Sequence, residues 1–268
     1  MPGVLRVLQP SRNSRSRGGP LAIFVATKAE LKPLSRALRS AYRSPGASDS
    51  ITRVALDGRE LLLARTGMGP QNAEAAARRL LDEASVAAAL ALGVAAGLSP
   101  QLQAGDLIVG DRVILHRGDG TPRQTFPCDA ELQESALTVI RRSGDRYQHG
   151  PIVTVDQIVL PAAEKRGLAA ESGAIAVDME SAAIASAASA HEVPFLAIRG
   201  ILDPVQEDLE IAFHQFLDGR GEPRPLPLIR YLVTHPLAVP RLVGLAFQTK
   251  TVCSRLGSLL REFSAVRA

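Results

Sequence analysis

The chain has 268 residues, of which 46% are hydrophobic and 22% are charged. These values are typical of a globular protein with a sizeable core, and they exclude wholesale disorder, collagen-like repeats and a coiled coil. The net charge of +4 is uneven: residues 1–20 carry +4 and residues 220–268 carry +6, which leaves −6 for the middle of the chain. No basic face is visible on the body of the protein, so the sequence predicts no nucleic-acid partner.

The cysteines and the first residues of the chain indicate in which cellular compartment the protein is expected. Cys128 and Cys253 are far apart, and neither belongs to a CxxC motif or has a histidine partner. We therefore expect no disulfide and no zinc site, in a reducing, cytoplasmic compartment. Residues 1–20 are rich in Arg, Ser and Gly and lack the apolar stretch of a signal peptide, which predicts a disordered basic tail.

Short β-branched and Leu-rich runs alternate with Ala-rich stretches, which predicts one α/β domain over 21–219. The predicted strands are 21–27, 53–56, 60–66, 86–94, 106–115, 152–159, 174–179 and 195–202, and the predicted helices are 28–43, 71–84, 129–143, 162–171 and 180–191. The apolar run 86–98 is too short to span about 30 Å of hydrocarbon, so we interpret it as a buried strand. Asp57-Gly58 predicts a hairpin between the second and third strands.

Residues 220–268 differ in character from the rest of the chain. Apolar runs alternate with isolated basic residues, and Pro227, Pro236 and Pro240 predict two or three short amphipathic helices. One interpretation is that this extension packs on the domain or on a second subunit. The other is that it lies at a membrane surface or at the entrance to a lipid-binding site.

A glycine-containing turn is predicted at 66–73, TGMGPQNA, between a strand and a helix. Asn72 stands where a dinucleotide-binding fingerprint requires glycine, so no dinucleotide cofactor is expected. The backbone around Gly69 can still offer N–H groups to an anion or to a ribose hydroxyl. A plain strand–helix turn accounts for the motif equally well.

Three carboxylates, Glu30, Glu180 and Asp203, directly follow apolar strands, and ligands of parallel α/β sheets gather at that end. Glu180 precedes the uncharged helix 181–190, and a buried carboxylate there requires a partner or a function. Glu30 can also be read as a solvated first-turn acid, and Asp203 as a turn residue before Pro204. Asp178 is interpreted as structural. The histidines show no ligand spacing, so no metal is predicted.

Four segments carry a family resemblance: IFVATKAELKPL (23–34), ARTGMGPQNAEAAA (64–77), LALGVAAGLSPQLQAGDLIVGD (90–111) and AVDMESAAIASAASAHEVPFLAIRGILD (176–203). They resemble the nucleoside phosphorylase/nucleosidase superfamily, and most of all its methylthioadenosine/S-adenosylhomocysteine nucleosidase branch. The resemblance covers most of 21–219. It implies a three-layer α/β/α sandwich with a central mixed, partly barrel-like sheet, usually assembled as a homo-oligomer.

The resemblance implies a role for each carboxylate. Glu30 falls on the glutamate that activates the attacking water, and Glu180 on the glutamate that holds the ribose hydroxyls. Asp203 falls on the aspartate that protonates N7 of the departing purine. Breaking an N-glycosidic bond builds positive charge on the ribose and negative charge on the base, so both an acid and a carboxylate are needed. We therefore expect burial to raise the pKa of Asp203.

The resemblance also implies the remaining substrate contacts. Met179 is expected against the sugar, Ile158 and Val159 on the strand that flanks the base, and Phe213 on the 5′ side of the sugar. Three positions depart from the family pattern. Leu202 replaces a serine that would orient the aspartate, Ile158 replaces an aromatic residue that stacks on the base, and Val94 replaces a serine found in many relatives. No arginine set matches the phosphate clamp of the phosphorylases, which favours water as the nucleophile.

The V-D-M-E-S core, the sequence Leu202-Asp203-Pro204 and the extension beyond Gly219 together resemble the hopanoid-biosynthesis-associated nucleosidases. This implies adenine release from adenosylhopane, a lipid-linked adenosyl substrate, and peripheral contact with the inner membrane through 220–268. Three alternatives stay open: a methylthioadenosine/S-adenosylhomocysteine nucleosidase, a phosphate-dependent purine nucleoside phosphorylase, and a nucleoside sensor without enzymatic activity.

Overall fold

The structure is a computed structural model that describes residues 19–38, 42–45, 51–118, 121, 123–159, 161–206, 211 and 213–266. Most of the predicted basic tail (1–18) and residues 39–41 of the first predicted helix lie outside the described residues. The strands are β1 (Leu21–Val25), β2 (Tyr42–Pro45), β3 (Ile51–Leu56), β4 (Arg59–Arg65), β5 (Ala88–Gly97), β6 (Leu107–His116), β7 (Gln124–Pro127), β8 (Tyr147–Val155), β9 (Ala176–Asp178) and β10 (Phe195–Asp203). The helices are α1 (Lys28–Ala37), α2 (Pro70–Glu83), α3 (Ala130–Ser143), α4 (Ala162–Ser172), α5 (Ser181–Ala190), the 3₁₀ turn η1 (Phe213–Gln215), α6 (Pro225–Thr234) and α7 (Ala238–Val266).

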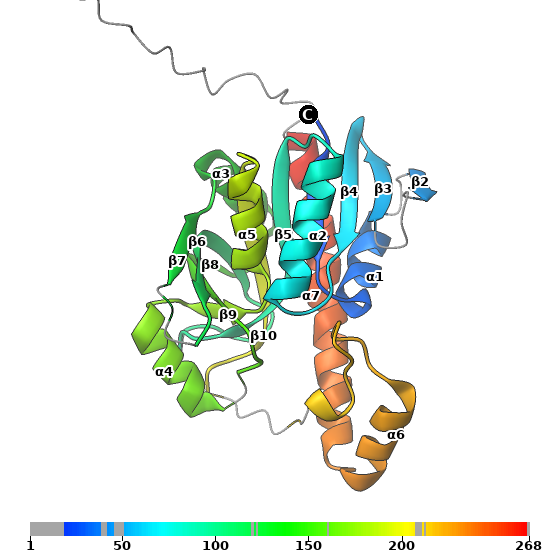
Figure 1. Cartoon of the computed structure of the whole chain (residues 1–268), viewed down its shortest axis with the longest axis vertical. Helices are drawn as coiled ribbons and strands as arrows, with labels where there is room; N and C mark the ends of the chain where they lie inside the picture. The colour runs from blue at the N-terminus through cyan, green and yellow to red at the C-terminus, as the bar shows by residue number, and fades with distance from the viewer. Residues whose placement is uncertain are drawn as a thin grey trace, which may run out of the picture.

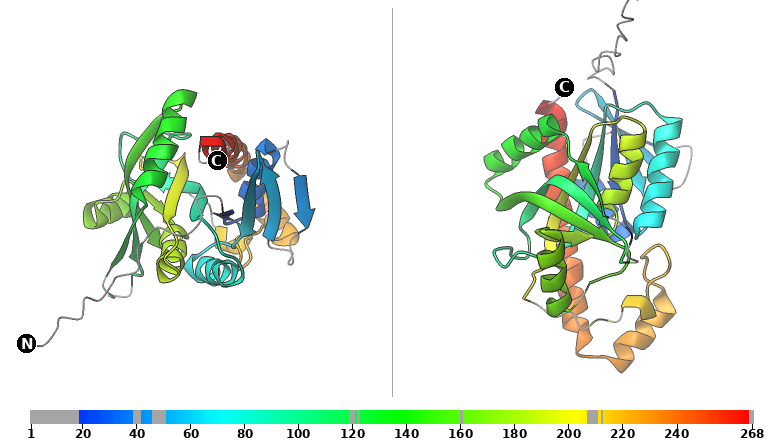
Figure 2. Two further views of the ribbon diagram at one scale, coloured as in Figure 1. Left: turned by 90° about the horizontal axis from the view of Figure 1, so that it is seen from above. Right: turned by 60° about the vertical axis from the view of Figure 1, so that its left-hand side comes forward.

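The described strands form one mixed sheet in the order β10-β6-β8-β9-β5-β1-β4-β3-β2, with β7 added to β6. Because β10 also pairs with β5, the strands β10, β6, β8, β9 and β5 close into a barrel, and the remaining strands extend from it as an open wing. Helices α2 and α5 cover one face, and α1, α3 and α7 cover the other (Figures 1 and 2). The predicted sandwich with a partly barrel-like sheet is confirmed.

The hairpin was predicted correctly from the sequence, but two short strands, β2 and β7, were not predicted. Asp57 and Gly58 have φ values of 49° and 82°, as a two-residue turn between antiparallel strands requires, and β3 pairs with β4 around them. Residues 42–45, of which the first two were assigned to a helix, form strand β2 and pair with β3. Strand β7 was not predicted, because its four residues carry no clear alternation of polar and apolar side chains.

Strand β8 ends earlier than predicted. It also begins earlier, because it contains Gly150 and Pro151. These residues read as a break in the sequence, but Pro151 lies beside an irregularity in the pairing of β6 with β8, where proline is tolerated. Gly150 allows a close approach, since a Cβ atom there would lie 2.8 Å from the side chain of Ile175. The strand ends at Val155, so the prediction that it extends to Val159 is wrong.

The prediction of two or three short helices beyond residue 219 is also wrong. The extension holds one short helix, α6, and one of 29 residues, α7. Pro227 and Pro240 lie in the first turns of these helices, where the missing N–H group is not needed for a hydrogen bond. None of the described helices, α7 included, is long and apolar enough to cross a membrane.

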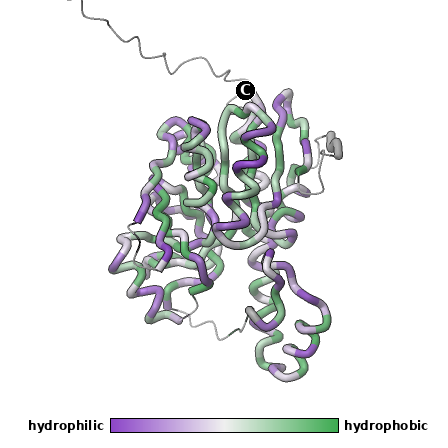
Figure 3. Tube along the Cα trace, viewed as in Figure 1, coloured by the Kyte–Doolittle hydropathy of each residue, from purple (hydrophilic) through white to green (hydrophobic). Residues whose placement is uncertain are grey.

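Helix α7 has two different halves. Its second half is part of the main core and packs against α1, through the buried residues Val252, Cys253, Leu256, Leu259, Leu260 and Phe263. Gly257 permits this contact, because a Cβ atom there would lie 2.5 Å from the carbonyl oxygen of Leu34. The first half projects from the body together with α6 (Figure 1), and hydrophilic and hydrophobic segments alternate along both (Figure 3). We call residues 225–250 the α6–α7 hairpin.

Candidate active site

Glu30 is held at the start of α1, immediately after β1. Thr27 caps the helix: its side-chain Oγ1 accepts a hydrogen bond from the Glu30 N–H (3.4 Å) and donates one to Glu30 Oε2 (2.8 Å). The Thr27 N–H also donates to Oε2 (2.9 Å), and the Val94 N–H of β5 donates to Oε1 (3.0 Å). The Glu30 side chain is therefore fixed at both oxygens, and because the residue is only 4% exposed, its interpretation as a solvated first-turn acid is wrong.

Glu180 lies at the N-cap of α5, which is uncharged and buried as predicted. Its Oε1 accepts a hydrogen bond from the Gly69 N–H (3.0 Å), and its Oε2 lies 3.8 Å from Nη2 of Arg199. Gly69 has a φ of 92°, a conformation that residues with a side chain rarely adopt. The glycine turn before α2 therefore serves to direct a backbone N–H at Glu180.

Burial raises the pKa of Glu180 from 4.5 to about 7. The positive charge of Arg199 and the Gly69 hydrogen bond act in the opposite direction, whereas the negative charges of Asp178 and Glu30 add to the effect of burial. The folded chain therefore holds a proton on Glu180 between pH 4.5 and about 7 that the unfolded chain releases. The contribution of Glu180 to stability consequently falls as the pH rises through that window.

Glu180→Gln is expected to flatten the dependence of stability on pH. Between pH 4.5 and 7 the free energy of unfolding of the wild type should fall by about 3 kcal/mol at most as Glu180 loses its proton. The amide does not titrate, so the variant should not show this decrease. The measurement is urea unfolding followed by circular dichroism at several pH values. Glu83→Gln, at an exposed position in α2, is the matched control and should keep the wild-type slope. Parallel slopes for the wild type and Glu180→Gln would contradict the prediction.

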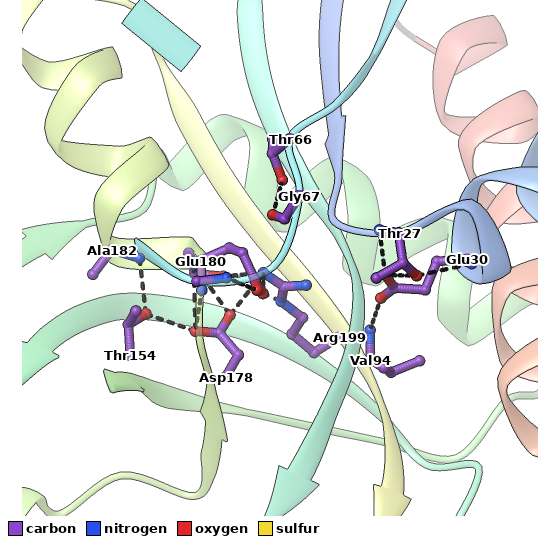
Figure 4. Close-up of polar contacts among 12 residues, drawn as sticks. Thr27, Glu30, Thr66, Gly67, Val94, Thr154, Asp178, Glu180, Ala182 and Arg199 are labelled. Carbon is purple, nitrogen blue, oxygen red and sulfur yellow. Dashed lines mark hydrogen bonds and ion pairs between the residues drawn. The ribbon is translucent and has the colours of Figure 1, made fainter. Parts of the chain in front are cut away.

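Arg199 is a central residue of the site that the sequence analysis missed. It is 1% exposed and lies between Glu30 and Glu180 (Figure 4). Its Nη2 atom lies 2.7 Å from Asp178 Oδ2, and a Cβ atom on Gly93 would lie 2.4 Å from Nη1 and 2.6 Å from Glu30 Oε1. Gly93 thus leaves the space in which the two side chains meet. The signal in the sequence was a single charge inside the apolar strand FLAIRGI.

Asp178 anchors this arrangement from below, in agreement with its structural interpretation. Its Oδ1 accepts a hydrogen bond from Thr154 Oγ1 (2.6 Å), and Thr154 Oγ1 in turn accepts one from the Ala182 N–H (2.9 Å). Ser181 Oγ accepts a hydrogen bond from Arg199 Nη2 (2.9 Å). The buried guanidinium is therefore paired and hydrogen-bonded, as a buried charge requires. Among the described residues, no three His, Cys, Asp or Glu side chains are grouped so as to hold a metal ion.

Asp203 lies at the end of β10, on the same pair of strands as Arg199. Arg199 pairs with Gly93 of β5 and Asp203 pairs with Ala96, three residues further along, which corresponds to about 10 Å. Asp203 is 5% exposed, so it is not an ordinary exposed turn residue. Its Oδ2 contacts the Nζ atom of Lys165 in α4, another residue that the sequence analysis missed. The expectation that burial raises the pKa of Asp203 did not take this ammonium into account.

The other predicted contact residues differ in their placement. Met179 is half-buried between Asp178 and Glu180. Val159 packs against the apolar cluster at the end of β8, but Ile158 is 38% exposed, and neither lies on the strand as predicted. The ring of Phe213 lies 5.7 Å from that of Phe216, in an apolar cluster at the base of the α6–α7 hairpin. The structure thus brings the carboxylates to one end of the barrel and places Phe213 with the extension.

Comparisons with known proteins identify a family and several relatives. A family model described as the phosphorylase superfamily matches residues 20–233. The chain is 26% identical over 245 residues to a 5′-methylthioadenosine/S-adenosylhomocysteine nucleosidase of Mycobacterium bovis, covering 79% of this chain and 96% of that protein. It is 26% identical over 208 residues to an aminodeoxyfutalosine nucleosidase of Campylobacter jejuni, covering 74% and 91%.

A solved structure confirms the fold. The crystal structure of 5′-methylthioadenosine/S-adenosylhomocysteine nucleosidase from Campylobacter jejuni superimposes with a TM-score of 0.72 at 20% sequence identity. The superposition covers 92% of this chain and 99% of that structure, so the two chains share one fold. The family model covers most of the chain, and the conclusion is that the chain belongs to the phosphorylase superfamily.

Proposed function

We propose that this protein is a purine nucleosidase that cleaves the N-glycosidic bond of a 5′-substituted adenosine and releases adenine. The observation that carries the proposal is the burial of Glu30, Glu180 and Asp203 at one end of the barrel. Burying three carboxylates is costly, and an oxocarbenium-like transition state is what a negatively charged site of this kind stabilises. The chain is thus an enzyme of the N-glycosidase class.

Each carboxylate has a step in the reaction. Asp203 donates its proton to N7 of the purine as the bond between C1′ and N9 breaks, so the base leaves as neutral adenine. Glu180 accepts hydrogen bonds from the ribose hydroxyls. Glu30, fixed at both oxygens, accepts a proton from the water that attacks C1′ and stabilises the cationic sugar.

Water rather than phosphate is the proposed nucleophile. The arginine beside Glu30 and Glu180 is Arg199, and its charge is already balanced by Asp178 at 2.7 Å. It is therefore not available to bind a second anion in the way that a phosphate clamp requires.

The proposed substrate carries an apolar 5′ group, as in adenosylhopane, and this part of the proposal rests on the α6–α7 hairpin. The named relatives favour the alternative, a 5′-methylthioadenosine/S-adenosylhomocysteine nucleosidase. Adenine release by the purified protein is to be compared for adenosylhopane in mixed micelles, methylthioadenosine and S-adenosylhomocysteine. The highest kcat/KM is expected for adenosylhopane, without added phosphate. Preference for either thioether would establish the alternative.

Two further outcomes of the same assay would overturn hydrolysis itself. Turnover that depends strictly on phosphate and yields ribose-1-phosphate products would identify a phosphorylase. Lack of adenine release from every adenosyl compound, by protein that binds them, would identify a nucleoside sensor.

The hairpin also supports peripheral contact with a membrane. Of the eight large hydrophobic side chains exposed in the described part of the chain, all but Ile158 lie on it: Leu226, Ile229, Val233, Leu237, Val239, Val243 and Phe247. Acidic residues are absent between Glu222 and Glu262, whereas six basic residues lie in this segment: Arg224, Arg230, Arg241, Lys250, Arg255 and Arg261. An apolar surface with only basic charges is the composition that binds anionic lipid headgroups.

Removing three apolar side chains of the hairpin is expected to weaken vesicle binding. Leu226, Val233 and Leu237 are 80%, 74% and 93% exposed, so replacing all three with serine should leave the fold intact. The triple variant should bind anionic vesicles about tenfold or more weakly than the wild type, since each buried Leu contributes roughly 1.5–3 kcal/mol. Co-sedimentation measures binding, and Ile158→Ser is the control. Equal binding by wild type and triple variant, or equal binding to neutral and anionic vesicles, would contradict membrane contact through the hairpin.

A further inference from the structure

We propose that Lys165 is a positioning residue that fixes the carboxyl group of Asp203 against the departing base; this inference rests on the proposed nucleosidase function. Lys165 belongs to α4 and is 0% exposed. Lysine is almost never fully buried unless its charge is paired. In α4 it lies on the same inward face as the buried Ala162 and Leu168, and Arg166 beside it is exposed.

The ammonium of Lys165 contacts the end of β10 at two atoms. Its Nζ atom contacts Asp203 Oδ2 and donates a hydrogen bond to the carbonyl oxygen of Pro204 (3.2 Å). One cation thus binds the side chain of Asp203 and the backbone of the next residue. Leu202, which precedes Asp203, has no polar side-chain atom that could orient the carboxyl group. Lys165 thus holds Asp203 from a helix about 40 residues earlier in the chain.

The contact has a chemical consequence for the proposed reaction. When Asp203 protonates N7, its O–H bond breaks, an N7–H bond forms, and the electron pair of the C1′–N9 bond passes to the base. Asp203 is left as a carboxylate in a buried site, where an unpaired charge is costly. The ammonium of Lys165 stabilises that carboxylate, so it lowers the energy of the transition state in which the proton moves. Before the proton moves, the carboxyl group of Asp203 is neutral and interacts less strongly with the ammonium, so substrate binding gains little from Lys165.

The test is a double-mutant cycle with Lys165→Met and Asp203→Asn, measured by adenine release. Lys165→Met is expected to lower kcat by about 10- to 100-fold with KM within about twofold, because the interaction is made in the transition state. Arg166→Met, the exposed neighbour in the same helix, should keep kcat within about twofold. In the Asp203→Asn background, Lys165→Met should change kcat by less than about twofold. The asparagine has no proton to donate and forms no carboxylate for Lys165 to stabilise.

A purely structural role predicts other results. If Lys165 only holds α4 in place, Lys165→Met should lower kcat by the same factor in both backgrounds, or raise KM with kcat unchanged, and either result overturns the proposal. If Lys165→Met alone does not fold, the double variant and Asp203→Asn are compared directly. Equal kcat supports the proposal, and a further loss overturns it. Removing both charges should also give a higher Tm than Lys165→Met alone, since that variant leaves a buried carboxylate without its counter-ion.

The same four proteins separate this inference from the proposed function. Near-normal turnover of Asp203→Asn would remove Asp203 from the chemistry and overturn the role of Lys165, while the adenine released would leave the nucleosidase proposal standing. Lack of adenine release by the wild type from every adenosyl compound would overturn the proposed function. Loss of turnover in Asp203→Asn, together with an unimpaired Lys165→Met, would overturn the role of Lys165 and leave the nucleosidase proposal standing.

Discussion

Glu30→Gln is expected to lower kcat for adenine release by about 10²–10⁴-fold, the usual range for removal of a general base. The carboxylate of Glu30 accepts three hydrogen bonds, from the Thr27 N–H, the Thr27 hydroxyl and the Val94 N–H. An amide has the same shape but cannot take the proton of the attacking water, and its NH₂ group must face at least one of these donors. Initial rates at saturating substrate measure the effect.

The variant should also be somewhat less stable, because the capping box of α1 is weakened by about 0.5–2 kcal/mol. Thermal unfolding therefore accompanies the rate measurement, and rates are taken well below the midpoint. Glu131→Gln is the matched control, because Glu131 is also a first-turn acid but is exposed, in α3. A folded Glu30→Gln variant with a rate within about tenfold of the wild type would exclude Glu30 as the general base.

Asp203→Asn is expected to lower kcat by a similar factor, about 10²–10⁴-fold, with purine substrates. Asparagine can still accept a hydrogen bond from Lys165, but it has no proton to give to N7. The leaving group distinguishes this loss from that of Glu30→Gln. With p-nitrophenyl riboside, whose leaving group needs no protonation, Asp203→Asn should be close to the wild type and Glu30→Gln should remain impaired.

Two results of the comparison between leaving groups would contradict the role of Asp203 as the acid that protonates the base. If Asp203→Asn is equally impaired with both substrates, the residue supports the site in some other way than by protonating the base. If it retains near-normal turnover of the purine substrate, Asp203 takes no part in the reaction. Wild-type Tm for the variant is not expected, because the ammonium of Lys165 loses its counter-ion.

Much of the fold could be predicted because its signals are local. The helix start after β1, the turn at Asp57-Gly58 and the uncharged helix after Glu180 each depend on neighbours within a few residues. The same holds for the carboxylates at strand ends, whose burial follows once the strands form a sheet. Errors arose where a local signal was overruled by packing, as at Gly150 and Pro151 of β8 and at the prolines of α6 and α7.

By itself, the sequence determined the α/β class, the order of most strands and helices, and the three acids at the ends of β1, β9 and β10. Only the tertiary structure decided that β10 closes against β5, that α7 runs back to pack on α1, and that Arg199 and Lys165 are the cations of the site. The physical reason is distance along the chain. A buried charge is stable only beside its partner, and the partners of these carboxylates are brought to them by strand pairing and helix packing between segments far apart in sequence.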